Sequence, residues 1–271
     1  MTRLTHFPRA WGICWGICTL FLGCDDVTSL EELPYIERMV VAGVVEAGST
    51  EIQVTFSRTM PPSEVFTPEK ALLTDVTGRI VVASGSYPLT HVGGGVYRAT
   101  GLTLLSGQEC ELHASWNGME ISATTLVPFP PTLDSAVVAP DTPTGGSIAL
   151  MAFVRGKTGE CYGMTYEVKS GASLMAGGAF SKMSVGKSGA QPTVLEEIYS
   201  GSLSTSDTVY AVVHAYDDPF YEYFISRAGN SIGHDDLLFP AAWGYVNWNV
   251  QGDGIGMFIG HSLSRIRASQ R

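Results

Sequence analysis

The strongest constraint on the fold is a period-two alternation of apolar and polar residues that begins near Arg38. Short runs rich in Val, Ile and Thr repeat along the chain, separated by turn sequences such as GST, TGR, GGG and NG. The runs are RMVVAGVVEAG, EIQVTFS, KALLTDV, RIVVAS, GVYRAT and CELHASW. This period is typical of strands with one buried face. The sequence therefore predicts an all-β fold of the sandwich or barrel type.

A proline cluster divides this first β region from a second. VPFPPTLDS, residues 127–135, has three prolines in four residues, which disfavour a central strand and stiffen a linker. After it come SIALMAFVRG, CYGMTYEVKS, DTVYAVVHAYD and FYEYFIS, which we predict as strands. We therefore predict an N-terminal β-sandwich domain over 37–127, a Pro-rich linker over 128–135 and a C-terminal β-rich domain over 136–271. The order of runs in the first domain resembles an Ig-like or transthyretin-like sandwich.

The first 23 residues have the features of an export signal. Arg3 and Arg9 precede an apolar stretch, residues 10–22, of about 13 residues. That is too short for a membrane-spanning helix of about 20 residues but typical of a signal peptide. The stretch ends in LFLGC, which resembles a bacterial lipobox, where the peptide is cut before the cysteine and the thiol is acylated. We predict a signal peptide over 1–23 and lipidation at Cys24, with an ordinary signal peptide as the alternative.

The charge of the mature chain limits its partners. Removal of the signal takes away two Arg and no acid, which changes the formal net charge from −10 to −12. Such a chain is not expected to bind nucleic acid or an anionic membrane surface. The polar stretch CDDVTSLEELPYI over 24–36 is predicted to be an acidic tether. Membrane attachment would then depend on the acyl chains.

Two cysteines, Cys110 and Cys161, remain outside the signal and the lipidation site. In an exported chain they are candidates for a disulfide. Each lies in its own predicted strand, however, and pairing needs Cα atoms within about 7 Å. The alternative is two buried cysteines that pack as small apolar residues.

Sequence motifs for nucleotide cofactors and for metal ligands are missing. NVQGDGIGMFIG, residues 249–260, has glycines at the wrong spacing for a dinucleotide fingerprint and is followed by a strand-like pattern. We predict that it forms a closing strand of the second domain. No P-loop sequence and no zinc-ligand spacing occurs. We therefore expect no cofactor, no metal site and no enzymatic activity.

Two histidines stand near paired carboxylates. HAYDD places His214 before Asp217 and Asp218, and HDD covers residues 234–236. Both segments are predicted to be solvated acidic turns, with loose Ca²⁺ binding as the alternative.

Aromatic residues crowd between positions 220 and 248. Tyr221, Tyr223, Trp243 and Trp248 are the candidates for contact with a ligand, because exposed rings can stack on sugars or peptides. The favoured alternative is that these rings fill the core of the second domain and the seam between the domains.

The C-terminal part of the chain has a series of short motifs in a fixed order. They are a Y-x-Y motif, a later proline, an Asn followed by Val, and a GxGxF strand, at Tyr221, Tyr223, Pro240, Asn249, Val250, Gly254, Gly256 and Phe258. With these motifs, the lipobox and the VPFPPTLDS junction, the chain resembles a lipoprotein family common in Bacteroidota, domain of unknown function 4249. Members of that family show the same motifs, with Ile or Val after the Asn.

This resemblance implies a cell-envelope function. Family members look like outer-membrane lipoproteins, often encoded beside TonB-dependent transporters, and none of their residues is an established catalyst. We therefore expect an exported, outer-membrane lipid-anchored protein, facing the periplasm or the cell surface, that binds a ligand or assists a TonB-dependent transporter in nutrient uptake. The alternatives are a surface adhesion or structural lipoprotein, and a hydrolase with a spatially assembled carboxylate or metal site.

Overall fold

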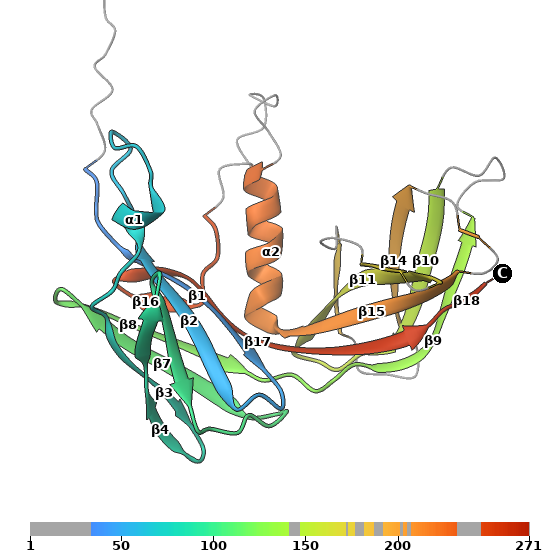
Figure 1. The fold of residues 1–271 in the computed structure, drawn as a ribbon, viewed down its shortest axis with the longest axis horizontal. Coiled ribbons are helices and arrows are strands. Elements are labelled where there is room, and N and C mark those ends of the chain that lie inside the picture. The colour runs from blue at the N-terminus through green and yellow to red at the C-terminus, as the bar shows by residue number, and fades with distance from the viewer. Residues whose placement is uncertain are drawn as a thin grey trace, which may run out of the picture. The chain divides into compact units, whose positions relative to one another are not determined.

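One long strand, β17 (Gly254–Arg267), pairs with both halves of the chain (Figure 1). The computed structural model describes residues 34–140, 147–171, 173–176, 182–186, 192–200, 203–204, 207–231 and 245–270. The predicted signal peptide, Cys24, nearly all of the tether, residues 234–236 and Trp243 lie outside these residues. Residues 37–271 form one unit of the chain and residues 1–36 another.

The prediction of an all-β fold is confirmed, with strands in three sheets. The nine-stranded sheet has the order β12 (Ser173–Ala176), β11 (Glu160–Ser170), β15 (Thr208–Asp217), β17, β1 (Met39–Glu46), β2 (Glu51–Arg58), β6 (Val96–Thr100) and β5 (Thr90–Gly93), with β13 (Met183–Val185) on β11. The five-stranded sheet has the order β16 (Val250–Gly252), β8 (Met119–Leu126), β7 (Glu109–Trp116), β3 (Thr77–Val82) and β4 (Gly85–Pro88). The four-stranded sheet has the order β14 (Thr193–Ser200), β10 (Ser147–Arg155), β9 (Thr132–Pro140) and β18 (Ser269–Gln270).

The pairing of β17 changes partner at His261. From Gly254 to His261 the strand runs parallel to β1, and from His261 to Arg267 it runs antiparallel to β15. His261 is the position that pairs with both neighbours, with Glu46 on one side and Tyr216 on the other. The two halves of the chain therefore share one continuous sheet through β17. The sequence predicts that the segment 249–260 closes the second domain, but β16 and the first half of β17 pair with β8 and β1 and belong to the first sandwich.

Two hydrophobic cores lie against this sheet. The first is formed by buried residues of β1, β2, β6 and β17 against β3, β7 and β8, with Phe56, Leu112 and Phe258 fully buried. The second is formed by β11 and β15 against β9 and β10, with Leu150 and Tyr162 fully buried. Each core is enclosed between two sheets, which is the sandwich arrangement that the alternating runs predict.

Some local predictions are wrong. FYEYFIS is not a strand but part of α2 (Asp218–Ser231), which no strand pattern anticipates. KALLTDV begins in the short helix α1 (Pro68–Ala71) and continues as irregular backbone. Residues 127–131 lie outside any strand, whereas β9 begins at Thr132, inside the segment predicted as linker.

The start of α2 has a physical explanation in its first residues. Asp218 lies in the first turn, where its carboxylate is attracted by the positive N-terminal end of the helix dipole. Pro219 follows directly, and proline is well tolerated in a first turn because its missing N–H has no intrahelical partner there. Among the described residues, no helix is long and apolar enough to cross a membrane.

Candidate functional site

The nine-stranded sheet has an outer face, opposite the second core, that carries titratable and aromatic side chains. On β15 this face holds Tyr210, His214 and Tyr216, which alternate with core residues. The cross-strand register brings His261 of β17 and Thr165 of β11 to the same face. Helix α2 contacts β11, β13, β15 and β17.

Four side chains form a hydrogen-bonded row across this face. Thr165 Oγ1 lies 3.0 Å from His214 Nε2, and His214 Nδ1 lies 3.0 Å from His261 Nε2. His261 Nδ1 lies 3.1 Å from Glu46 Oε1. The row, which we call the histidine row, runs through β11, β15, β17 and β1 and so joins both halves of the sheet.

When both histidines are neutral, the hydrogen bonds of the histidine row can have only one order of donors and acceptors. An ionised Glu46 can only accept, so His261 donates through Nδ1 and accepts through Nε2. His214 then donates through Nδ1, which leaves its Nε2 to accept the Thr165 hydroxyl proton. All three contacts are satisfied at once when both imidazoles are neutral.

Burial keeps His214 in this neutral form. Desolvation is the main cause that lowers the pKa of His214 to about 4, and the neighbouring His261 lowers it further. Glu46 acts in the opposite direction. His214 is thus an uncharged imidazole at neutral pH, with the row reaching solvent at Glu46, whose side chain is 61% exposed.

A row of aromatic rings continues from the two histidines onto α2. The rings of His261 and Tyr216 have centroids 4.9 Å apart, and those of Tyr216 and Phe220 are 4.2 Å apart. Phe220 is followed by Tyr223 at 5.8 Å, and Tyr223 by Trp248 at 5.4 Å. Ring pairs at such distances attract each other by about 0.5–1.5 kcal/mol. We call Tyr216, Phe220, Tyr223 and Trp248 the aromatic row.

The aromatic row belongs to neither hydrophobic core of the described chain. The interpretation that the predicted aromatics fill the second core therefore does not hold for Tyr223 and Trp248. Trp248 is 40% exposed and the nearby Tyr245 is 93% exposed. Of the other two candidates, Tyr221 lies on α2, half-buried, and Trp243 is outside the described residues.

A buried polar cluster lies on the other face of the same strands. Thr125 donates to Asp217 Oδ2 at 2.5 Å, and the Gly260 amide donates to Thr125 Oγ1. Burial is the main cause that raises the pKa of Asp217 to about 6. His214 and Asp217 are therefore parts of a strand and not of a solvated turn, which corrects the sequence interpretation.

The two cysteines are free and buried, so the structure shows the second of the two alternatives. Cys110 belongs to the first core, whereas Cys161 lies on β11 with its Sγ 3.5 Å from the Asp217 carbonyl. Burial raises the pKa of Cys110 to about 12 and raises that of Cys161 strongly. Both groups are thiols and not thiolates at neutral pH, so neither is a nucleophile.

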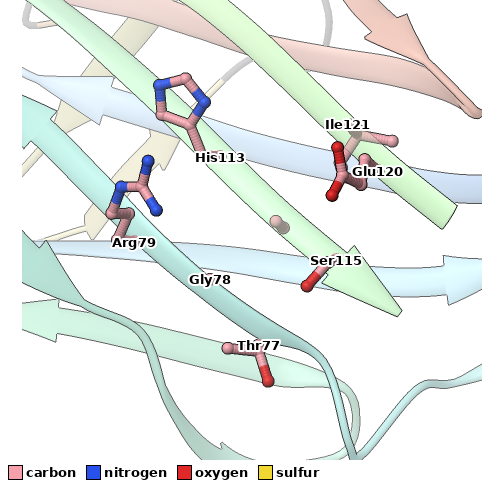
Figure 2. Close-up of a pocket in the computed structure, with 8 residues that line it drawn as sticks. Thr77, Gly78, Arg79, His113, Ser115, Glu120 and Ile121 are labelled. Carbon is pink, nitrogen blue, oxygen red and sulfur yellow. The ribbon is translucent and has the colours of Figure 1, made fainter. Parts of the chain in front are cut away.

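An open hollow of about 360 Å³ lies on the outer face of the five-stranded sheet. Figure 2 shows Arg79 beside His113, with Thr77, Ser115 and Glu120 nearby. His113 Nε2 contacts Glu111 at 3.0 Å, and Arg79 forms no ion pair with the part of the chain that the structure describes. This solvated polar surface can bind a small polar ligand by hydrogen bonds but has no buried ionisable group.

Sequence reasoning missed Glu46, Thr165 and His261 as members of a site. The two ends of the Glu46–His261 contact are 215 positions apart in the chain. A lone Thr in a strand and a His after a glycine carry no motif. Only the parallel pairing of β1 with β17 brings Glu46 and His261 together.

The fold and the site define an all-β sandwich protein with a histidine row and an aromatic row on one sheet face. No family model matches this chain, and the comparison with curated proteins finds no match. A chain of a cytokine receptor complex is 12% identical, over 83% of this chain and 94% of its own, with a TM-score of 0.26. A DUF4785 family protein from Legionella pneumophila is 15% identical, over 66% of this chain and 52% of its own, with a TM-score of 0.23. Neither similarity carries an argument about function.

Proposed function

We propose that this protein is an exported, lipid-anchored protein of the outer membrane that binds a ligand through the aromatic row. It would do so as an accessory to a TonB-dependent transporter in nutrient uptake. The anchor is supported by the LFLGC sequence and by the resemblance to the lipoprotein family. The binding role is supported by the aromatic row, which is the observation that carries the proposal.

The aromatic row favours binding for a physical reason. Large rings that serve only the fold are normally placed in a core, whereas these rings lie outside both cores and end at a partly exposed Trp248. Tyr and Trp supply a large apolar area at little cost in side-chain entropy and stack on sugars and peptides. An exposed Tyr245 extends this surface by one more ring.

Anchoring is tested by Cys24→Ala. We expect the variant to move from the membrane fraction to the soluble fraction of the native cells, because an acyl chain contributes about 0.8 kcal/mol per buried methylene. Immunoblots of the two fractions measure the change. Membrane retention equal to that of the wild type would refute lipidation.

The binding role is tested in the same cells with the double variant Tyr223→Ala, Trp248→Ala. We expect it to remain membrane-bound and folded but to reduce growth on the limiting nutrient as strongly as deletion of the gene does. Phe66→Ala is the matched control, because Phe66 is an exposed ring, 67% accessible, far along the chain from the row. Normal growth of the deletion strain, together with cross-linked membranes that yield no transporter, would count against the proposal.

A further inference from the structure

The last two rings of the aromatic row are accompanied by a polar pair, one position earlier in each segment. Tyr223 of α2 and Trp248 have ring centroids 5.4 Å apart. Directly before them in the chain, Asn247 Nδ2 lies 3.5 Å from Glu222 Oε2. We call Glu222, Tyr223, Asn247 and Trp248 the binding platform. Apolar rings and hydrogen-bonding groups are therefore neighbours where the chain returns alongside α2.

The returning segment holds Trp248 from both sides. The Asn247 backbone N–H donates to Ser226 Oγ at 2.9 Å. The Asn249 side chain bonds the backbone of Phe258 in both directions. Because the backbone before and after Trp248 is tied down, little conformational entropy is lost when a ligand stacks on its ring.

The groups of the platform can be reached from solvent. Trp248 is 40% exposed, and Glu222 and Asn247 are exposed as well. With the described part of the chain, these two polar side chains form no hydrogen bond other than the one between them. One carboxylate oxygen, the amide oxygen and one amide N–H are therefore left for a ligand.

The charges around the platform disfavour an anionic ligand. The charged side chains of α2 are Asp218, Glu222 and Arg227, which is one more acid than base. The whole chain also has an excess of acids, with a formal net charge of −10. Like charges repel one another, so the platform suits a ligand without negative charge.

Rings and polar groups together favour one class of ligand. A sugar ring has a face of C–H groups, which can stack on an aromatic ring, and an edge of hydroxyl groups, each of which donates and accepts. Its hydroxyl groups can donate to Glu222 and can both donate to and accept from Asn247. An apolar peptide segment would cover the rings but leave the Glu222 carboxylate without a partner as water is lost, which is unfavourable.

From these contacts we infer that the ligand of the platform is a neutral oligosaccharide. The inference rests on the binding role proposed above and names the ligand class for that site. One sugar unit stacks on the exposed part of Trp248, and hydroxyl groups of the same or the next unit bond Glu222 and Asn247. Tyr245, which is 93% exposed, offers a further ring to a longer chain of sugars.

The experiment is a calorimetric titration of the purified protein with neutral oligosaccharides of glucose, mannose, galactose and xylose, with oligogalacturonate as the anionic comparison. We expect saturable binding of at least one neutral oligosaccharide and weaker binding of oligogalacturonate. Trp248→Ala should weaken binding about tenfold or more, as truncation of a central aromatic residue commonly does. Trp248→Phe keeps a ring and should restore most of the affinity. Phe66→Ala is again the matched exposed-ring control and should bind like the wild type.

Glu222→Gln tests the polar half of the platform. We expect about three- to tenfold weaker binding, because hydrogen bonds to a charged acceptor are the stronger ones. Glu222 is exposed, so the variant should keep the unfolding temperature of the wild type.

The failure of this inference can be told apart from the failure of the proposed function. If the wild type binds none of the neutral oligosaccharides, or binds oligogalacturonate more tightly, the inference is overturned. It is also overturned if Trp248→Ala binds them as tightly as the wild type. The proposed function still stands in these cases when the double variant Tyr223→Ala, Trp248→Ala reduces growth. Normal growth of that variant would instead count against the proposed function itself.

Discussion

At the scale of the residue, Gly256 shows why the glycine-rich segment marks a strand and not a ligand loop. Its φ of +117° lies in a region that side chains rarely adopt, and a Cβ there would lie 2.1 Å from the carbonyl oxygen of Val41. Glycine is therefore required for the close approach of β17 to β1. Asn249 adds a second link, because its side chain bonds the backbone of Phe258 in both directions.

We predict that Gly256→Val destabilises the fold by about 3 kcal/mol or more, since it combines backbone strain with a backbone clash. Gly48→Val is the matched control. Gly48 also has a positive φ, +83°, but no atom lies within 4 Å of its added Cβ. We expect a cost of about 1–2 kcal/mol there. Urea unfolding measures both, and equal losses would show that the close approach to Val41 is unimportant.

Asp217 is a second residue with a measurable signature. Its pKa is raised from 3.8 to about 6 in the folded chain, so between these two pH values the folded state holds a proton that the unfolded state has released. The stabilisation from this carboxyl is therefore complete below pH 4 and is lost as the pH rises through about 6. Glu160, also buried, is its partner in the register of β11 and β15.

Asp217→Asn should remove this pH dependence. Between pH 4 and pH 7.5 the wild type should lose on the order of 3 kcal/mol relative to the variant. Unfolding in urea at the two pH values measures the difference, with the exposed neighbour in Asp218→Asn as control. Parallel stability curves for wild type and Asp217→Asn would contradict the role of burial.

At the scale of the element, the described side chains of α2 contact their surroundings through aromatic rings. The Phe220 ring packs at a tilt against Tyr216 of β15, and Tyr223 contacts Trp248 after the helix. Ser226 Oγ accepts the backbone N–H of Asn247, which fixes the returning chain. The helix thereby positions the aromatic row.

Glu222→Pro should break this element. Proline within a helix removes one hydrogen bond and clashes with the preceding turn, at a cost of about 3 kcal/mol. We expect lower helical ellipticity at 222 nm and a changed fluorescence of Trp248, with the two cores still folded. Glu222→Ala is the control for the loss of the carboxylate, because Glu222 is exposed. An unchanged spectrum of the proline variant would show that the segment is not a helix in solution.

At the scale of the whole molecule, β17 couples the two cores. It contributes Phe258 to the first core, while Ile266 of the same strand packs against the second. If either sandwich unfolds, β17 loses a paired strand, β1 or β15, although it is still needed by the other sandwich. We expect residues 37–271 to unfold as one cooperative unit.

Leu112→Ala tests this coupling. Leu112 is fully buried in the first core, and its truncation should cost about 2–5 kcal/mol. Hydrogen exchange of amides in β10 and β15 should accelerate by the same factor as that of amides in β7. Val44→Ala, at a 47% exposed position, is the control and should change neither. Acceleration confined to the first sandwich would mean that the cores unfold independently.

The amino-acid sequence by itself determined the all-β class and part of its strands, because alternation with period two is a local property that one buried face imposes. It also determined that the segment 249–260 lacks the glycine spacing of a nucleotide site. It misjudged α2, since Tyr and Phe favour strands on average and FYEYFIS is rich in both.

Only the tertiary structure decided the shared sheet and the histidine row. Pairing of β1 with β17 is a contact between distant segments, and no local pattern encodes which strands become neighbours. Glu46 and His261 are ordinary residues until this pairing places them 3.1 Å apart. The strands follow from local chemistry, whereas the candidate site follows from long-range pairing, because a spatial cluster of single residues leaves no periodic trace in the sequence.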